Sequence, residues 1–214
     1  MREIGFTLLL LVSVPLIHCV FILPAQFTWI VHLQELHPRF NPPKLSTAEG
    51  QYYFDYTQGP YVATRQQNEV WPETWREDIP YNVFLGVGGL IYMGYLNGTS
   101  GKTTCIPPYL KYSPSYWPRN FLASNCTLVG QSVTLPKVFG GQYQDGKLGN
   151  AYKCKMEGFD ATAYTSVDES GLLRMDFEER LPGWNAQTWD TVLMTPQSFP
   201  PNYWQPPSWL QCTP

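Results

Sequence analysis

The sequence has 214 residues, of which only 14% are charged, and its formal net charge is −3. It therefore lacks the basic stripe that would neutralise phosphates, which argues against nucleic acid as a partner. Aromatic residues make up 15% of the chain, which also contains 17 glycines and 20 prolines, a composition typical of strands and ordered loops.

A short polar start, Met1-Arg2-Glu3, precedes an almost wholly apolar run over residues 4–17. A bilayer-spanning helix needs about 20 apolar residues, whereas this run has the length of a signal-peptide core. We interpret residues 1–19 as a signal peptide, with cleavage near Cys19 or Ala25, and residues 20–214 as a single secreted domain. The alternative is an uncleaved anchor. No later run reaches membrane length, so we expect an extracellular or lumenal protein that does not span a membrane.

The next predicted elements are one helix and several strands. Apolar residues at spacings of three predict a short helix ending before Pro38: Phe27, Ile30, Leu33 and Leu36. Alternation over residues 51–56 predicts a strand with Tyr52, Phe54 and Tyr56 on one face. Residues 61–70 predict a polar edge strand. Residues 83–86 and 90–96 are apolar on both faces, which predicts paired central strands.

The stretch YLNGTSGKTTC, residues 95–105, combines a partial phosphate-loop pattern with a glycan acceptor. A phosphate-binding loop requires glycine where Leu96 stands, so that pattern is broken. Asn97-Gly98 between apolar runs is instead a strong hairpin signal. Asn97 and Asn125 both begin Asn-x-Thr acceptor sequences, and we predict a glycan on each.

Four further strands are predicted over residues 132–139, 149–158, 161–166 and 172–179, with a last strand or short helix at 189–194. In the strand at 172–179, Leu173, Met175 and Phe177 face one way, while Arg174, Asp176 and Glu178 face the other. The fold class predicted is mainly β (α+β): a curved antiparallel sheet with one or two short helices.

Four of the five cysteines remain if Cys19 leaves with the signal peptide: Cys105, Cys126, Cys154 and Cys212. An even number in an oxidising compartment predicts two disulfides, with three possible pairings. No two of these cysteines stand at the spacing of a zinc site, so no metal is predicted there.

The order of these features resembles the ependymin-related secreted proteins and their structural relatives, the bacterial lipoprotein carriers of the LolA type. It consists of the Phe54-Asp55 strand, a Tyr-rich hairpin ending at Cys105, a Pro-rich stretch to a second cysteine, a Cys154 strand, a Gly-Leu-Leu-Arg-Met-Asp strand, and a Phe-Pro-Pro tail closing at Cys212.

The resemblance implies a half-open antiparallel barrel whose mouth is plugged by helices and whose concave apolar face holds lipid or another hydrophobic ligand. It also implies a Cys105–Cys212 disulfide, which leaves Cys126 to pair with Cys154. The family is associated with calcium and extracellular matrix, but the sequence has no acidic loop of EF-hand spacing.

No hydrolase elbow, His-Glu-x-x-His or Cys-His signature is present, and the only histidines beyond the leader are His32 and His37. We therefore predict no catalytic residues, no cofactor and no enzymatic activity. The candidate ligand-binding residues are those expected on the concave face: Tyr52, Phe54, Ile91, Met93, Tyr95, Leu173, Met175 and Phe177. The strand parity at residues 91–95 is open, because both faces there are apolar.

Two functions follow as hypotheses. The first is a secreted carrier or sensor that binds a hydrophobic, lipid-like molecule among these residues. In the competing interpretation of the same residues, they form a filled core. The second function is a structural or adhesive component of an extracellular or cell-surface assembly, because Trp204 and Trp209 stand in a Pro-rich stretch that could bind extracellular proteins. Burial of these tryptophans on their own sheet would count against this second function.

Overall fold

The computed structural model describes residues 20–37, 44–58, 63–70, 81–87, 90–97, 100–106, 118–138, 143–156, 159–178 and 186–205. Of the strands between residues 64 and 106 only the backbone is described. The predicted signal peptide at 1–19, Cys212 and Trp209 lie outside these ranges. Within them, no helix has both the length and the apolar character needed to cross a membrane.

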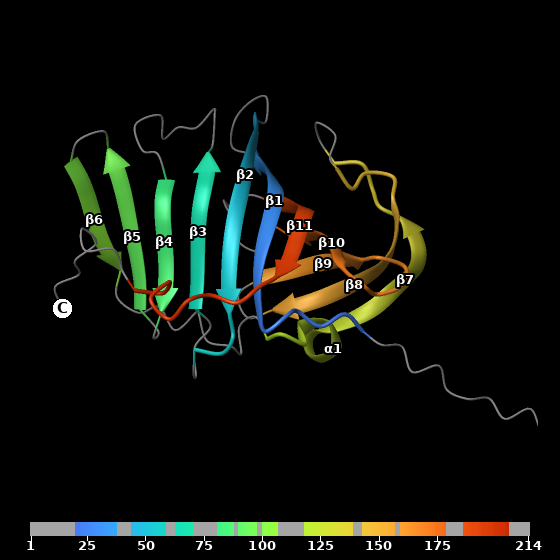
Figure 1. Cartoon of the computed structure of the whole chain (residues 1–214). Coiled ribbons are helices and arrows are strands. Elements are labelled where there is room, and N and C mark those ends of the chain that lie inside the picture. The colour runs from blue at the N-terminus through green and yellow to red at the C-terminus, as the bar shows by residue number, and fades with distance from the viewer. Residues whose placement is uncertain are drawn as a thin grey trace, which may run out of the picture.

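In this part of the chain the strands form one 11-stranded antiparallel sheet, in the order β6-β5-β4-β3-β2-β1-β11-β10-β9-β8-β7 (Figure 1). The first group is β1 (Gln26–His37), β2 (Lys44–Asp55), β3 (Ala63–Val70), β4 (Tyr81–Val87), β5 (Leu90–Asn97) and β6 (Ser100–Ile106). A short helix, α1 (Phe121–Asn125), leads to the second group: β7 (Cys126–Thr134), β8 (Leu148–Met156), β9 (Phe159–Thr165), β10 (Leu172–Phe177) and β11 (Ala186–Pro196). The predicted fold class, a mainly β curved antiparallel sheet, is confirmed.

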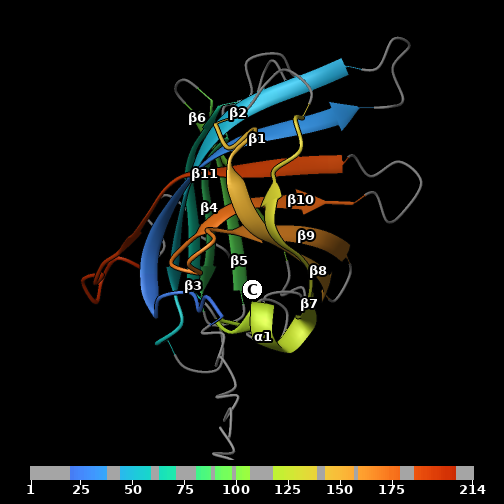
Figure 2. The same cartoon turned by 90° about the vertical axis from the view of Figure 1, so that its right-hand side faces the viewer.

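The chain builds the sheet from the middle outward and then back again. Strands β1 to β6 pair in sequence order, and β7 to β11 then return from the other edge, so that β11 pairs with β1. One half of the sheet, made of β1, β11, β10, β9, β8 and β7, curls. The helix α1 lies at one end of this curl (Figures 1 and 2). The residues buried by this curl form the largest core cluster, and we call the sheet face that carries them the inner face.

Strand β1 is the element that the sequence pattern predicted wrongly. Instead of a helix, residues 26–37 form a strand paired along its length with β2 and β11. The same segment also alternates with period two, and four of its residues are at most 2% exposed on the inner face: Phe27, Trp29, Val31 and Leu33. The segment is rich in aromatic and β-branched residues and pairs with a strand on both sides, which favours a strand over the helix that the spacing of three predicts.

Three further predictions about strand positions need correction. Residues 63–70 do not form an edge strand, because β3 pairs with both β2 and β4. β4 and β5 pair as predicted, but they lie near the edge formed by β6 rather than at the centre. The strand expected at 132–139 begins already at Cys126 and ends at Thr134.

The hairpin predicted at Asn97 is confirmed by the backbone register, since β5 and β6 pair with Asn97 opposite Ser100. The last strand is also confirmed, as β11.

Strand β10 contains an irregularity that changes which residues share a face. Its pairing with β9 shifts between Leu172 and Arg174, so Leu173 is an extra residue, as in a β-bulge. Leu172, Met175 and Phe177 consequently pack in the inner-face core, whereas Leu173 packs in a separate cluster with Leu135, Ala151 and Tyr164. The prediction that Leu173 shares a face with Met175 and Phe177 is wrong for this reason.

The segment after β11 crosses the outer face of the sheet over β2 and β3 (Figure 1). There Trp204 is 3% exposed and packs with Ala63, Tyr53, Phe199 and Tyr203. Trp204 is therefore packed on its own sheet rather than projecting towards a partner.

The carboxylate of Asp55, at the end of β2, holds this segment in place. It is fully buried and accepts hydrogen bonds from Trp204 Nε1 at 3.0 Å, Gln26 Nε2 at 2.8 Å and Gln58 Nε2 at 2.7 Å. The backbone and hydroxyl of Thr57 donate at 2.8 and 2.6 Å. Burial opposes ionisation, but these hydrogen bonds outweigh it and hold the pKa of Asp55 below its ordinary 3.8.

Replacing Asp55 by Ala is expected to lower the free energy of unfolding at neutral pH by about 2–4 kcal/mol, because several buried donors lose their acceptor. Since the folded pKa is depressed, this stabilisation is present above pH 3.8 and is lost as the pH falls through the folded value. Urea unfolding at several pH values measures it. The control is Glu49→Ala, at an exposed position of β2; equal losses for the two variants would contradict the assignment.

Candidate functional site

The inner face carries a connected group of large aromatic rings, which we call the inner aromatic group: Trp29, Tyr52, Phe54, Phe177 and Trp189. The ring of Trp189 on β11 stacks on Tyr52 of β2 with centroids 5.1 Å apart, and Phe177 of β10 meets Trp189 edge-on, also at 5.1 Å. β1 lies between β2 and β11, so these rings converge across an intervening strand.

Two rings of the inner aromatic group are buried and three are partly exposed. Trp29 is 1% exposed and Tyr52 9%, while Phe54, Phe177 and Trp189 are half-buried. Trp29 Nε1 donates to Thr191 Oγ1 at 2.9 Å, and Trp189 Nε1 donates to Gln187 Oε1 at 3.1 Å, so both indole N–H groups have partners. A surface of this kind offers apolar contact to a ligand without an unpaired polar group beneath it.

The structure brings four of the predicted binding residues together. Tyr52, Phe54, Met175 and Phe177 all belong to the inner-face core, and Met175 is completely buried. This close packing also fits the alternative interpretation of a filled core.

The backbone register extends the same face towards β5. Tyr52 is linked through Gln66 and Phe84 to Met93, and Phe54 is linked through Thr64 and Gly86 to Ile91. Residues directly opposite in an antiparallel pair share a face, so Ile91 and Met93 occupy positions on the inner face. Tyr95 stands opposite Tyr81 and Lys102. For Ile91, Met93 and Tyr95 the structure describes only the backbone.

Sequence reasoning missed Trp29 and Trp189 as members of the group. The helix predicted for the segment of Trp29 does not place this residue on a sheet face, and a strand or short helix at 189–194 leaves the face of Trp189 undetermined. The available signal was the alternation of apolar residues along 27–33, which places Trp29 on the same face as Phe27 and Leu33.

A buried ionic cluster occupies the opposite, outer face, where sequence reasoning placed only surface charges. Arg174 is fully buried; its Nε and Nη2 donate to the two carboxylate oxygens of Asp190 at 2.5 and 3.1 Å. Nη2 also donates to Asp145 at 2.7 Å, and Nη1 to the carbonyl of Pro136 at 2.7 Å. Pro136 and Asp145 belong to the β7–β8 connection, so these contacts hold that connection against β10 and β11.

The neighbouring Asp176 is in a different electrostatic situation. Burial raises its pKa from 3.8 to about 6, although Arg174 and a hydrogen bond with Thr188 partly oppose this, while Asp190 and Asp145 add to it. One of its carboxylate oxygens, Oδ1, is buried and has no hydrogen-bond partner among the residues that the structure describes. Within the described residues, no group of three or more His, Cys, Asp or Glu side chains is arranged to hold a metal.

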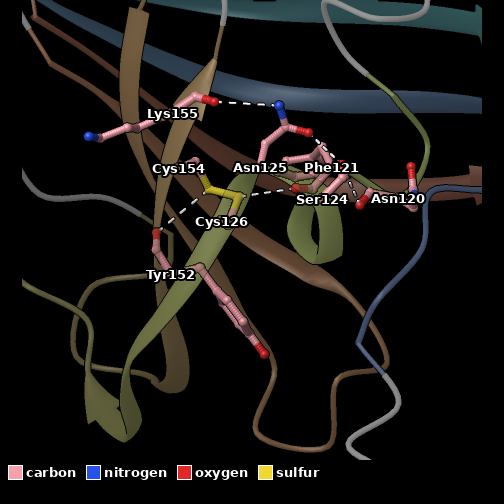
Figure 3. Close-up of a disulfide and its surroundings, with 8 residues drawn as sticks. All are labelled: Asn120, Phe121, Ser124, Asn125, Cys126, Tyr152, Cys154 and Lys155. Atoms are coloured by element: carbon pink, nitrogen blue, oxygen red, sulfur yellow. Dashed lines mark hydrogen bonds between the residues drawn. A yellow bond between two sulfur atoms is a disulfide. The ribbon is translucent and has the colours of Figure 1, made fainter.

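Cys126 and Cys154 stand directly opposite each other on β7 and β8 and form a disulfide (Figure 3). This is the pair left over by the implied Cys105–Cys212 bridge, whose sulfur atoms lie outside the described residues. Next to it, Asn125 ends α1, is half-buried, and donates from Nδ2 to the carbonyl of Lys155 at 3.5 Å.

No family model and no curated protein sequence matches this chain. A solved structure of the Pseudomonas aeruginosa MucA/MucB complex is similar, with TM-score 0.42 and 11% identity, covering 88% of this chain and 58% of that one. A structure of MucB with MucA(peri) gives TM-score 0.39 and 12% identity, covering 88% and 57%. This chain thus spans less than two thirds of the length of these chains.

Replacing Asp176 by Asn is expected to stabilise the protein by about 1–3 kcal/mol at pH 7 to 8, because the variant no longer buries a charge. A raised folded pKa makes the wild type relatively more stable as the pH falls from about 6 towards 3.8, so the gain should disappear below pH 4. Thermal unfolding across this pH range measures the difference.

Asp168→Asn provides a control of opposite sign. Hydrogen bonds from Ser166 and Ser170 lower the pKa of the exposed Asp168 to about 2, so its loss should not stabilise the protein at neutral pH. A stabilisation by Asp176→Asn that persists unchanged at pH 3 would contradict the explanation.

Proposed function

We propose that the protein is an exported, non-enzymatic binding protein that holds a hydrophobic, lipid-like molecule against its inner face. The observation that carries this proposal is the inner aromatic group, in which the half-buried Phe54, Phe177 and Trp189 surround buried rings. Large apolar surfaces with few polar groups are the usual lining of small-molecule sites. The register positions of Ile91 and Met93 would extend the surface across the sheet.

The curvature of the sheet supports the same proposal. Because β1, β11, β10, β9, β8 and β7 curl around the inner face (Figure 2), a ligand there would contact several strands at once. The helix α1 would close one end through the buried Phe121 and Leu122. The resemblance to the ependymin-related and LolA-type proteins, in which such a face is thought to hold lipid, is part of this proposal. A curved antiparallel sheet and the Cys126–Cys154 disulfide are compatible with it.

The location outside the cytosol is likewise proposed. The apolar leader at residues 4–17 and the disulfide between Cys126 and Cys154 support it, because disulfides persist in oxidising compartments. Glycans at Asn97 and Asn125 would fit the same compartment.

The competing proposal is an adhesive or structural role in an extracellular assembly. The observation that favours it is the edge strand β7, on which Leu128 is 38% and Val129 59% exposed. An edge strand with exposed apolar residues can pair with another protein's strand. Burial of Trp204 on its own sheet removes part of the original motive for this role, so the ligand-binding proposal is preferred.

Phe177→Ala is expected to weaken binding of an apolar fluorescent probe or a fatty-acyl chain about tenfold, because it removes a half-buried ring from the inner aromatic group. Probe titration of the delipidated, folded protein measures this loss. Phe199→Ala is the matched control, since Phe199 is also half-buried but lies on the outer face against Tyr53 and Trp204. Equal effects of the two substitutions, or no binding of any apolar probe to the wild type, would overturn the proposal.

For the predicted glycans, Asn125→Gln and Asn97→Gln are each expected to remove one glycan mass when the protein is made by a glycosylating secretory host. Intact mass before and after enzymatic deglycosylation measures it. Identical masses for wild type and variants, apart from the substitution itself, would show that the positions are unmodified.

A further inference from the structure

Glu169, in the turn between β9 and β10, has a backbone conformation that residues other than glycine rarely adopt. Its φ is +58°, in the left-handed region, which costs a residue with a Cβ about 1 kcal/mol. This conformation accompanies a carboxylate that reaches strand β8. Glu169 Oε1 accepts hydrogen bonds from Tyr152 Oη at 2.6 Å and from Asn150 Nδ2 at 2.5 Å.

The two donors are themselves held in place. Asn150 Nδ2 also donates to the carbonyl of Val167 at 3.2 Å, while Asn150 Oδ1 accepts from the backbone N–H of Ser132 at 3.0 Å. Burial together with the Glu169 hydrogen bond raises the pKa of Tyr152, so its hydroxyl remains a donor at neutral pH. Both Asn150 and Tyr152 are less than a tenth exposed. The carboxylate therefore occupies a built polar site.

Within the described part of the chain, two buried polar atoms at this site have no hydrogen-bond partner. Glu169 Oε2 makes no hydrogen bond, although it is shielded from solvent. Thr165, opposite Asn150 on β9, is fully buried, and its Oγ1 also has no partner. None of the ion pairs among the described residues involves Glu169. A buried carboxylate oxygen without a donor is costly, which points to a bound group that supplies one.

The apolar core connects this polar site to the inner aromatic group. Tyr152 belongs to the same core cluster as Trp189, and the register runs from Tyr152 through Ala163 and Met175 to Trp189. Polar atoms at one end and aromatic rings along the remainder match an elongated molecule with one polar head and one apolar chain.

We propose that the Glu169 carboxylate receives the ammonium head of an alkylamine-type amphiphile, whose chain lies along the inner aromatic group. This inference depends on the function proposed above and specifies the chemical class of the ligand. An ammonium group donates to Oε2 and compensates its charge, a charge-assisted hydrogen bond stronger than one from a neutral hydroxyl. A carboxylate or phosphate head would be repelled by Glu169, and the neighbouring Tyr152 and Asn150 already use their donors on Oε1.

The test compares straight-chain alkylammonium, alcohol and carboxylate probes of equal chain length, titrated below their micelle concentrations into the full-length folded protein. The wild type is expected to bind the ammonium probe most tightly and the carboxylate least tightly. Glu169→Gln should weaken binding of the ammonium probe about tenfold, or about 1.4 kcal/mol, and leave the alcohol unchanged. Tyr152→Phe, which removes one hydrogen bond to Glu169 Oε1, should weaken binding of the ammonium probe by a smaller factor than Glu169→Gln does.

Glu178→Gln is the charge-matched control, because Glu178 is an exposed carboxylate paired with Lys153. It should change none of the affinities. If ammonium and alcohol probes bind equally and Glu169→Gln has no effect, the head-group assignment is overturned while hydrophobic binding survives. If no probe binds the wild type, the proposed function itself fails together with this inference.

Discussion

The alternation of buried apolar and polar residues along β1 determines which side chains form the inner face of the whole sheet. This strand pairs with β2 on one side and β11 on the other, and so joins the two halves of the sheet. Phe27, Trp29, Val31 and Leu33 point to the inner face and are almost completely buried. A shift of the register by one residue would place these apolar side chains on the outer face and Thr28 and Gln34 in the core. The same alternation decides where the aromatic rings of β2, β10 and β11 converge.

The outer face is stabilised by buried polar contacts of a different kind. Asp55 collects five donors from three segments of the chain, and Arg174 links β10, β11 and the β7–β8 connection through Asp190 and Asp145. Buried charges are tolerated only where geometry and hydrogen bonds compensate their desolvation. For Asp176, Arg174 and the hydrogen bond with Thr188 offset only part of the burial, so its pKa stays raised, whereas the Asp55 pKa is lowered. Asp55 thus holds the segment around Trp204, and Arg174 holds the β7–β8 connection, against the outer face.

Much of this arrangement could be predicted from the sequence, but the long-range contacts could not. Alternation at Tyr52, Phe54 and Tyr56 and the Asn97 hairpin signal identified β2 and the β5–β6 pair, because these features are local. The helix expected at 27–36 was wrong. The apolar residues of this segment fit both a helical spacing of three and a strand alternation of two, and only the strands that pair with the segment decide between helix and strand. The bulge at Leu173 and the burial of Arg174 depend on partners that are distant in the sequence. For the candidate site, Tyr52, Phe54, Met175 and Phe177 were found, while Trp29, Trp189 and Glu169 were missed.

According to the proposed function, a hydrophobic ligand contacts the inner face rather than an edge or the outer face. Paramagnetic relaxation from a spin-labelled alkyl chain, read out on the backbone amides of the isotope-labelled protein, tests this claim most directly. We expect the signals from β2, β10 and β11 around Tyr52, Phe177 and Trp189 to broaden first, and those of the exposed edge strand β7 and of the segment around Trp204 not to broaden. Broadening confined to β7, or spread evenly over the surface, would contradict this claim.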